Sequence, residues 1–222
     1  MNKTLLAVPC MNIVDTEFMA CFIDARDSLL KKEKVGYSLI RSSLVYDARN
    51  LLAKEALEKD YDRILFIDSD MVFDNDAFVR LSDTMDEGYD YVTGLFFYKT
   101  LPTKPAMYRG VYYDDSKEKI EAKLTTYFNY PRDSVFEIAG SGCAFTMIST
   151  DAIGKVVASG ERFPFSPVLG LGEDVSFCMR LHNAGVKMYC DSRVKIGHIG
   201  KFDVGEKQYI AQVEAGVKPH GD

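Results

Sequence analysis

Short apolar runs recur along the first half of the chain, and amphipathic stretches separate them. Apolar runs bounded by turn residues predict buried strands, whereas apolar residues spaced three or four positions apart predict helices. Strands are predicted at residues 5–8, 64–67 and 91–97. Helices are predicted at residues 15–34, from Ser43 to Ala56, and from Asp74 or Asn75 to Gly88. This alternation is typical of βαβ units, so the expected fold class is α/β with a largely parallel sheet.

The second half of the chain is less regular. Phe136 to Ile148 predicts a strand broken at Gly140-Ser141-Gly142, and Glu173 to Asn183 predicts a helix closed by Gly185. The other expected elements are a basic loop at 99–109, a hairpin at 111–128, a short helix capped by Ser149 or Thr150, a loop at 159–172 and a strand at 187–190. Residues 201–222 are polar and are expected to form a C-terminal tail.

Length and composition narrow the classes of protein to consider. The chain has 222 residues, of which 47% are hydrophobic, and this suits one large α/β domain. A net charge of -6 does not favour a broad nucleic-acid footprint or an anionic membrane surface. The five scattered cysteines include no Cys-x-x-Cys pair and suggest buried thiols in a reducing compartment. With neither a signal peptide nor a transmembrane run, we expect a soluble, cytoplasmic protein.

Two carboxylates separated by one serine, Asp68-Ser69-Asp70, follow the apolar run at 64–67 directly. Open α/β sheets bind ligands just beyond the carboxyl ends of their strands. Two anions this close repel each other unless a cation lies between them. Hard oxygen ligands favour magnesium or manganese, often shared with a substrate phosphate. The motif therefore indicates a metal or ligand site, although Asp and Ser are also common in simple polar turns.

A second group of chemically capable residues lies in the last third of the chain. Glu173 and Asp174 follow a glycine loop at the start of a predicted helix, where the helix dipole alone would favour acids. A lone histidine is usually structural, but His198 stands in a Gly-His-Ile-Gly segment that has no apolar face to join, and this leaves a ligand role open beside the structural one.

Taken together, these segments resemble the GT-A glycosyltransferases, most closely the single-domain, soluble, family 2-like type. The matching features, in chain order, are the strand ending at Pro9, the helix with Arg49-Asn50, Asp68-Ser69-Asp70, the strand with Gly94, Gly140-Ser141-Gly142, Gly172-Glu173-Asp174 and the stretch from Asp191 to His198. The resemblance implies a GT-A, Rossmann-like three-layer sandwich with a mixed, mostly parallel central sheet. It also implies one catalytic domain over residues 1–200, with a nucleotide-sugar-binding half (1–98) and an acceptor-binding half (99–200).

The resemblance implies a nucleotide-sugar donor, which we expect to be a UDP-sugar, with its diphosphate held on Mn²⁺ or Mg²⁺. The metal residues that the resemblance implies are Asp68, Asp70 and His198. Asp70 looks like the direct metal ligand, Asp68 like the partner of the ribose or of a metal-bound water, and His198 like a further ligand. Manganese accepts such mixed carboxylate and imidazole coordination. The residues expected to bind the donor are Pro9, Arg49, Asn50, Asp68, Ser69, Arg193 and Lys195.

In inverting members of the family, the aspartate of the Glu-Asp pair deprotonates the acceptor hydroxyl, and this role corresponds to Asp174. Glu173 would hold the acceptor or take over as base. Inversion is favoured, but the retaining outcome stays open because retaining GT-A enzymes share the Asp-x-Asp motif and the late histidine. The acceptor classes left open are a glycan, a lipid-linked sugar, a protein and a modified nucleic-acid base. The basic loop at 99–109 is a candidate acceptor surface.

The chain departs from the polysaccharide synthases of the family, because it contains no tryptophan and no Gln-x-x-Arg-Trp signature. A single transfer to a discrete acceptor is therefore expected. The main alternative is a phosphohydrolase of the haloacid dehalogenase type, in which Asp68 would be the nucleophile and Asp70 the acid or base. A non-catalytic carbohydrate-binding or nucleotide-sugar-binding module is the third interpretation.

Overall fold

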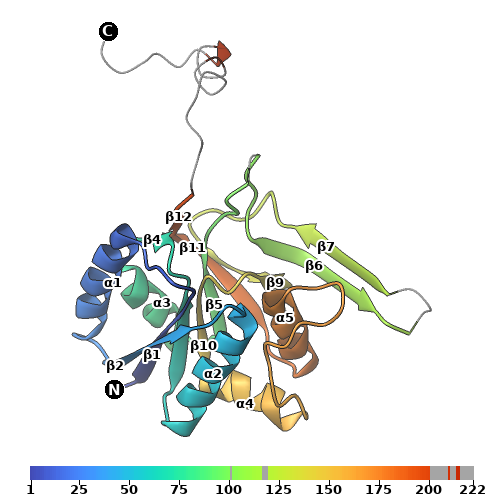
Figure 1. Cartoon of the computed structure of the whole chain (residues 1–222), viewed down its shortest axis with the longest axis horizontal. Helices are drawn as coiled ribbons and strands as arrows, with labels where there is room; N and C mark the ends of the chain where they lie inside the picture. The colour runs from blue at the N-terminus through green and yellow to red at the C-terminus, as the bar shows by residue number, and fades with distance from the viewer. Residues whose placement is uncertain (101, 117–119, 201–209, 211–213, 216–222) are drawn as a thin grey trace.

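The computed structural model describes residues 1–100, 102–116, 120–200, 210 and 214–215 of the chain. Strands and helices alternate from the N-terminus (Figure 1). The helices are α1 (Thr16–Leu29), α2 (Val45–Glu58), α3 (Ala77–Asp86), α4 (Thr150–Ala158) and α5 (Glu173–Asn183). The strands are β1 (Lys3–Cys10), β2 (Lys34–Arg41), β3 (Arg63–Ile67), β4 (Met71–Val72), β5 (Tyr91–Leu95), β6 (Met107–Asp114), β7 (Glu121–Thr126), β8 (Val135–Ile138), β9 (Gly140–Ser141), β10 (Phe145–Ser149), β11 (Met188–Lys195) and β12 (Gly197–His198).

Seven strands form the central sheet in the order β2-β1-β3-β10-β5-β11-β8. β1 is parallel to both β2 and β3, and β5 is parallel to β11. β10 runs antiparallel to β3 and β5 on its two sides, and β8 runs antiparallel to β11. The sheet is therefore mixed and mostly parallel, as the sequence predicted.

Helices cover both faces of this sheet (Figure 1). On one face, aromatic residues of α1 and α3, such as Phe18 and Phe78, pack with sheet residues such as Leu6. On the other face, residues of α2, α4 and α5 pack together with sheet residues such as Phe66. Burial of these two apolar layers is the main favourable term in folding. The predicted three-layer α/β sandwich is confirmed.

Two smaller ladders attach to the sandwich. β7, β6 and β9 form a three-stranded sheet whose β6–β7 hairpin extends away from the main sheet (Figure 1). The hairpin expected at 111–128 is thus present, although β6 begins at Met107, inside the stretch expected to be a loop. β4 and β12 form a ladder of two residues each. Most of the expected tail at 201–222 lies outside the described residues.

Several local predictions were wrong. β2 was not expected; it is an edge strand that leaves apolar residues such as Tyr37 exposed, so it lacks the pattern of a buried strand. Ser43 does not cap α2; the N-cap is Leu44, whose N–H is bound by Ser42 Oγ at 3.0 Å. The N-cap of α3 is Asp76, not the preceding Asp74 or Asn75.

The interrupted strand at 136–148 is confirmed, and its pieces belong to different ladders. β8 and β10 lie in the main sheet, whereas β9 pairs with β6. Ser149 caps α4 as expected, because its side chain accepts a hydrogen bond from the Ala152 N–H. Among the described residues, no helix combines the length and the apolar character needed to cross a bilayer.

Candidate functional site

The carboxyl ends of β1, β3, β5 and β11 lie at one edge of the central sheet. This is the edge at which open α/β folds bind ligands. Because β10 is antiparallel to β3, it begins where β3 ends, and the Asp68 N–H donates to the Ala144 carbonyl at 2.9 Å. Asp68 and Asp70 thus leave β3 beside the segment that precedes β10.

A tight turn after β3 presents Asp70 to His198. The Met71 N–H donates to the Asp68 carbonyl at 3.3 Å, and β4 then pairs antiparallel with β12, with Met71 opposite His198. The Ile199 N–H also donates to the Asp70 carbonyl at 2.8 Å. These backbone contacts bring together two residues that are far apart in the sequence.

The tautomer of His198 follows from its neighbours. His198 Nδ1 lies 2.9 Å from the Phe97 carbonyl, which can only accept, so Nδ1 carries a proton and donates it. His198 Nε2 lies 3.4 Å from Asp70 Oδ1. With Nδ1 donating to that carbonyl, Nε2 is the ring nitrogen that faces Asp70. This is the arrangement in which a histidine serves as a metal ligand through Nε2.

The ammonium group of a lysine also contacts Asp70. The Lys99 ammonium donates to Asp70 Oδ2. Burial alone would raise the pKa of Asp70, but the hydrogen bonds from His198 and Lys99 outweigh it and lower the pKa to about 2. Asp70 is therefore an anion at any physiological pH.

The donor set fits a hard divalent cation only in part. Asp70 and His198 offer one carboxylate and one imidazole, which suit Mn²⁺ and, less well, Mg²⁺. Among the described residues, no group of three or more His, Cys, Asp and Glu side chains is arranged to hold a metal ion. Asp68, the third expected ligand, is instead bound to an arginine. A metal here would need water and substrate oxygens to complete its coordination, as is usual for Mg²⁺.

Arg49 joins the two acidic pairs. Its Nη2 donates to Asp68 Oδ1 at 2.8 Å, and its Nε lies 3.6 Å from Glu173 Oε1. Its Nη1 donates to the Cys143 carbonyl at 3.2 Å, and only 3% of the side chain is exposed. Burial alone would lower the pKa of Arg49, but the charges of Asp68 and Glu173 outweigh it and raise the pKa. Arg49 is therefore not part of a solvated helix face.

Asp174 lies beside this bridge at the N-terminus of α5. Its Oδ1 accepts from the Val175 N–H at 2.7 Å. Burial, together with the neighbouring Glu173 carboxylate, raises the pKa of Asp174 to about 6; the Val175 N–H and Arg49 offset only part of this. A Cβ atom on Gly142 would lie 3.3 Å from Asp174 Oδ2, so this glycine leaves room for the carboxylate.

Two tyrosines lie near Asp174. Their hydroxyl groups, on Tyr98 and Tyr108, are hydrogen-bonded to each other. Burial raises the pKa of both side chains, and the Asp174 charge adds to the effect. Both phenols are therefore neutral hydrogen-bonding groups, with Lys104 Nζ lying 5.2 Å from the centre of the Tyr98 ring.

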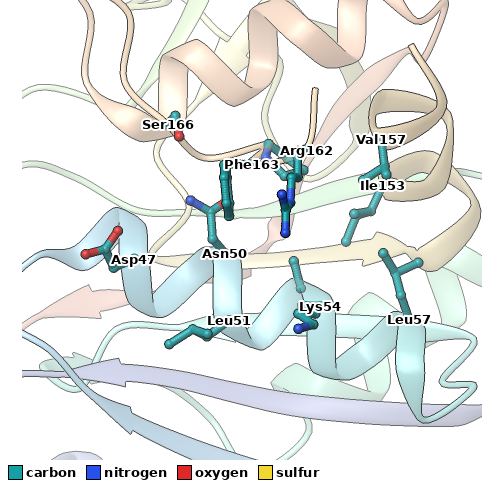
Figure 2. A pocket seen from close by; sticks show the side chains of 12 residues that line it. Asp47, Asn50, Leu51, Lys54, Leu57, Ile153, Val157, Arg162, Phe163 and Ser166 are labelled. Atoms are coloured by element: carbon teal, nitrogen blue, oxygen red, sulfur yellow. The ribbon is translucent and has the colours of Figure 1, made fainter. Parts of the chain in front are cut away.

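Asn50, although adjacent to Arg49, faces a different part of the molecule. Its Oδ1 accepts from the Phe165 N–H at 2.9 Å. It lines a cavity of about 530 Å³ between α2, α4 and the loop before α5, where it lies beside Phe163 (Figure 2). None of the acids at 68, 70, 173 and 174 lines this cavity. Asn50 therefore binds the backbone of the loop before α5 and does not lie with the acidic pairs.

The two downstream cations also have partners elsewhere. Arg193 binds Asp191, with 2.8 Å between Arg193 Nη2 and Asp191 Oδ2, and also contacts Thr84 on α3. Lys195 Nζ lies 3.1 Å from Asp133 Oδ1 at an exposed position. Neither contact involves the acidic pairs.

Pro9 and Ser69 lie at the sheet edge in different ways. Pro9 is inside β1 but lies beyond Ala7, the last residue of β1 that pairs with β3. Its missing N–H therefore removes no hydrogen bond from the β1–β3 ladder. Ser69 is in the turn between the two aspartates, and its carbonyl accepts from the Asp15 N–H at 3.4 Å.

Sequence reasoning missed four contributors to the site. Lys99 was assigned to the acceptor loop, yet it neutralises Asp70. The phenols of Tyr98 and Tyr108 and the Cys143 carbonyl were not considered. One signal was present in the sequence: Tyr98 and Lys99 directly follow the strand predicted at 91–97, so they had to emerge at the same sheet edge as Asp68.

Comparison with known proteins adds one finding. No family model matches the chain, and no curated protein matches it. Among solved structures, the crystal structure of A197 from STIV superposes with a TM-score of 0.62 at 24% sequence identity. The match covers 91% of this chain and 87% of that chain. This similarity shows a shared fold over nearly the whole length of both chains.

Proposed function

We propose that the protein is a metal-dependent GT-A glycosyltransferase that moves a sugar from a nucleotide-sugar donor to an acceptor hydroxyl. The observation that carries the proposal is the Arg49 bridge. It joins Asp68, from the donor half, to Glu173, from the acceptor half, with a guanidinium that is almost completely buried. One polar site thus contains both acidic pairs at the ligand-binding edge of an α/β sheet. The resemblance of the sequence motifs and the α/β fold support the same class.

Donor binding is assigned to the first acidic pair. Asp70 and His198 Nε2 would hold a Mn²⁺ or Mg²⁺ ion, which neutralises the diphosphate of the donor as it becomes the leaving group. Asp68, already fixed by Arg49, would bind the ribose or a water molecule on that ion. We expect the nucleotide to be UDP.

Proton removal from the acceptor is assigned to Asp174. A base acts best when its pKa lies near the working pH. With a pKa of about 6, Asp174 is mostly ionised at pH 7 and is still more basic than an ordinary aspartate. Glu173, held toward Arg49, would orient the acceptor. A carboxylate on the acceptor side favours transfer with inversion.

Thermal stability measured against UDP-, GDP-, CMP- and dTDP-sugars, with and without Mn²⁺, tests the proposal. A ligand that binds the native state raises the melting temperature by mass action. We expect a shift with one nucleotide class, only when Mn²⁺ is present. Asp70→Ala should abolish that shift, while Asp174→Asn should keep it and lose sugar transfer.

Asp83→Ala is the matched control, because Asp83 is 61% exposed and its ion-pair partner among the described residues is Lys32 at the surface. It should behave like the wild type. If no donor shifts the melting temperature and the protein instead releases phosphate from phosphoesters, the hydrolase with Asp68 as nucleophile replaces the transferase. Wild-type transfer rates in Asp174→Asn would exclude Asp174 as the base.

A further inference from the structure

Lys99 occupies the carboxylate that the proposed function assigns to a divalent cation. Asp70 has two oxygens, and each has a cationic or protonatable neighbour: Lys99 on Oδ2 and His198 on Oδ1. The Lys99 and Asp70 side chains are 39% and 35% exposed. The pair therefore lies at the mouth of the site, where water and ions can replace either partner.

The loop after β5 supplies one neighbour of Asp70, Lys99, and orients the other, His198, which lies on β12. The Phe97 carbonyl fixes the His198 ring, and Lys99 follows two positions later. The loop itself is closed by backbone hydrogen bonds from Tyr98 N to the Lys104 carbonyl and from Ala106 N to the Phe96 carbonyl, both 3.0 Å long. Because these bonds hold the backbone on both sides of Lys99, its ammonium can change partner by rotation of the side chain alone.

A divalent cation and an ammonium group cannot share one carboxylate at low cost. Like charges about 4 Å apart repel strongly near a protein surface, where the effective dielectric constant is about 20. A cation held by Asp70 and His198 would therefore expel Lys99 from Asp70. The diphosphate that accompanies such a cation is the nearest new anion, and a flexible lysine is well suited to bind it as a point charge.

We propose that Lys99 is an exchangeable counter-ion: it neutralises Asp70 when no divalent cation is bound and binds the donor diphosphate when the cation takes Asp70. This inference rests on the proposed function. It assigns diphosphate binding to Lys99 in place of Arg193 and Lys195, whose contacts lie elsewhere. It also requires that metal and diphosphate strengthen each other's binding, because each removes an obstacle to the other.

The test compares Lys99→Met with Lys104→Met. Both variants remove one positive charge from the same loop, but Lys104 contacts the Tyr98 ring and not Asp70. Titration calorimetry with Mn²⁺ alone should show roughly fivefold to tenfold tighter binding in Lys99→Met, and no more than about twofold change in Lys104→Met. With UDP or inorganic pyrophosphate present, Mn²⁺ should tighten diphosphate binding less in Lys99→Met than in the wild type.

A second measurement reads the exchange in the wild-type protein. The rate at which an amine-specific acylating reagent modifies Lys99, followed by mass spectrometry, should rise when Mn²⁺ is added and fall when UDP or pyrophosphate follows. The rate at Lys104 should stay constant. Protection of Lys99 by pyrophosphate to the same extent as by UDP would show that the diphosphate group, and not the nucleoside, is recognised.

The proposal is overturned if Lys99→Met binds Mn²⁺ no better than Lys104→Met, or if none of the proteins binds Mn²⁺. It is also overturned if the coupling with diphosphate is unchanged in Lys99→Met. Failure of the proposed function gives a different result: nucleotide sugars would not be consumed, while the competition between Lys99 and Mn²⁺ would persist.

Discussion

At the scale of single residues, Arg49 is the most constrained side chain of the site. A charged group that is only 3% exposed is costly unless its hydrogen bonds and charge are satisfied. Arg49 meets most of this requirement: its two terminal nitrogens donate to the Cys143 carbonyl before β10 and to Asp68 after β3, and Glu173 on α5 adds a second negative charge. Among the described residues its Nε has no hydrogen-bond acceptor and faces Glu173 at 3.6 Å. A planar guanidinium with several fixed donors can make these contacts together, and a lysine cannot.

Asp174 gives a prediction about stability and pH. Its pKa of about 6 in the folded state exceeds the ordinary value of 3.8, so the ionised form is disfavoured by folding. This penalty is fully present above pH 6 and disappears as the pH falls toward 4. Asp174→Asn should therefore stabilise the protein at pH 8 by about 1–2 kcal/mol, a value reduced for partial solvent exposure.

Urea unfolding of Asp174→Asn and wild type between pH 4 and pH 8 measures this effect. The stability difference should shrink steadily as the pH falls. Asp83→Asn, at an exposed position, provides the control and should show no such trend. A difference that is independent of pH would mean that the Asp174 carboxylate is ordinary.

At the scale of elements, the loop before α5 is held from two sides. Arg180, on α5, donates to the Pro164 carbonyl at 2.9 Å, and Asn50, on α2, binds the Phe165 N–H. The Ser166 carbonyl is a further acceptor for Arg180. These contacts connect α2, which carries Arg49, with the loop that leads into the Glu-Asp pair. The position of the acids at the start of α5 thus depends on the packing of two helices and the loop between them.

The segment between β9 and β10 gives a prediction about Gly142. A Cβ atom there would lie 3.2 Å from the Phe96 ring and 3.3 Å from Asp174 Oδ2, closer than most real Cβ contacts. Because Phe96 is buried, the Asp174 carboxylate is the group that must move. Gly142→Ala should reduce sugar transfer about tenfold or more, since catalysis is sensitive to small displacements.

Steady-state transfer rates and melting temperatures of Gly142→Ala and Gly110→Ala provide the measurement. Gly110 lies in β6, and its nearest neighbour, Thr125, would be 3.6 Å from the new Cβ. Gly110→Ala should therefore retain full activity. Equal activity in both variants would show that the space around Asp174 is not limiting.

At the scale of the whole molecule, the two halves of the chain share one sheet. β10, from the second half, lies between β3 and β5 of the first half, and β11 lies on the other side of β5. Two of the helices that cover one sheet face, α4 and α5, also come from the second half. The halves proposed to bind donor and acceptor are therefore not separate folding units.

This interleaving predicts the behaviour of fragments. A fragment of residues 1–98 lacks β10, so β3 and β5 lose their common neighbour. It should show no cooperative unfolding transition in urea, because β5 loses both of its neighbouring strands and α4 and α5 no longer cover their part of one sheet face. A fragment of residues 1–200 contains all the strands of the central sheet and should unfold cooperatively. Cooperative unfolding of the shorter fragment would show that its half folds alone.

The α/β class, most of the helices and the positions of the acids could be predicted from the sequence. The run at 64–67 followed by Asp68 and Asp70, and the glycine loop followed by Glu173, are local patterns that report burial and helix starts. Such patterns depend only on neighbours in the chain. The edge strand β2 escaped prediction because its apolar side chains are partly exposed and its burial is not local.

Only the tertiary structure decided which of these residues meet. The insertion of β10 beside β3 brings the Cys143 carbonyl to Arg49, and the two-residue ladder of β4 and β12 brings His198 to Asp70. Both arrangements depend on strand order and on ladders too short to leave a periodic signal. The charge balance of the site also depends on the tertiary structure. Lys99 donates to Asp70, and the separation of these two residues in the sequence does not indicate how close they lie in space.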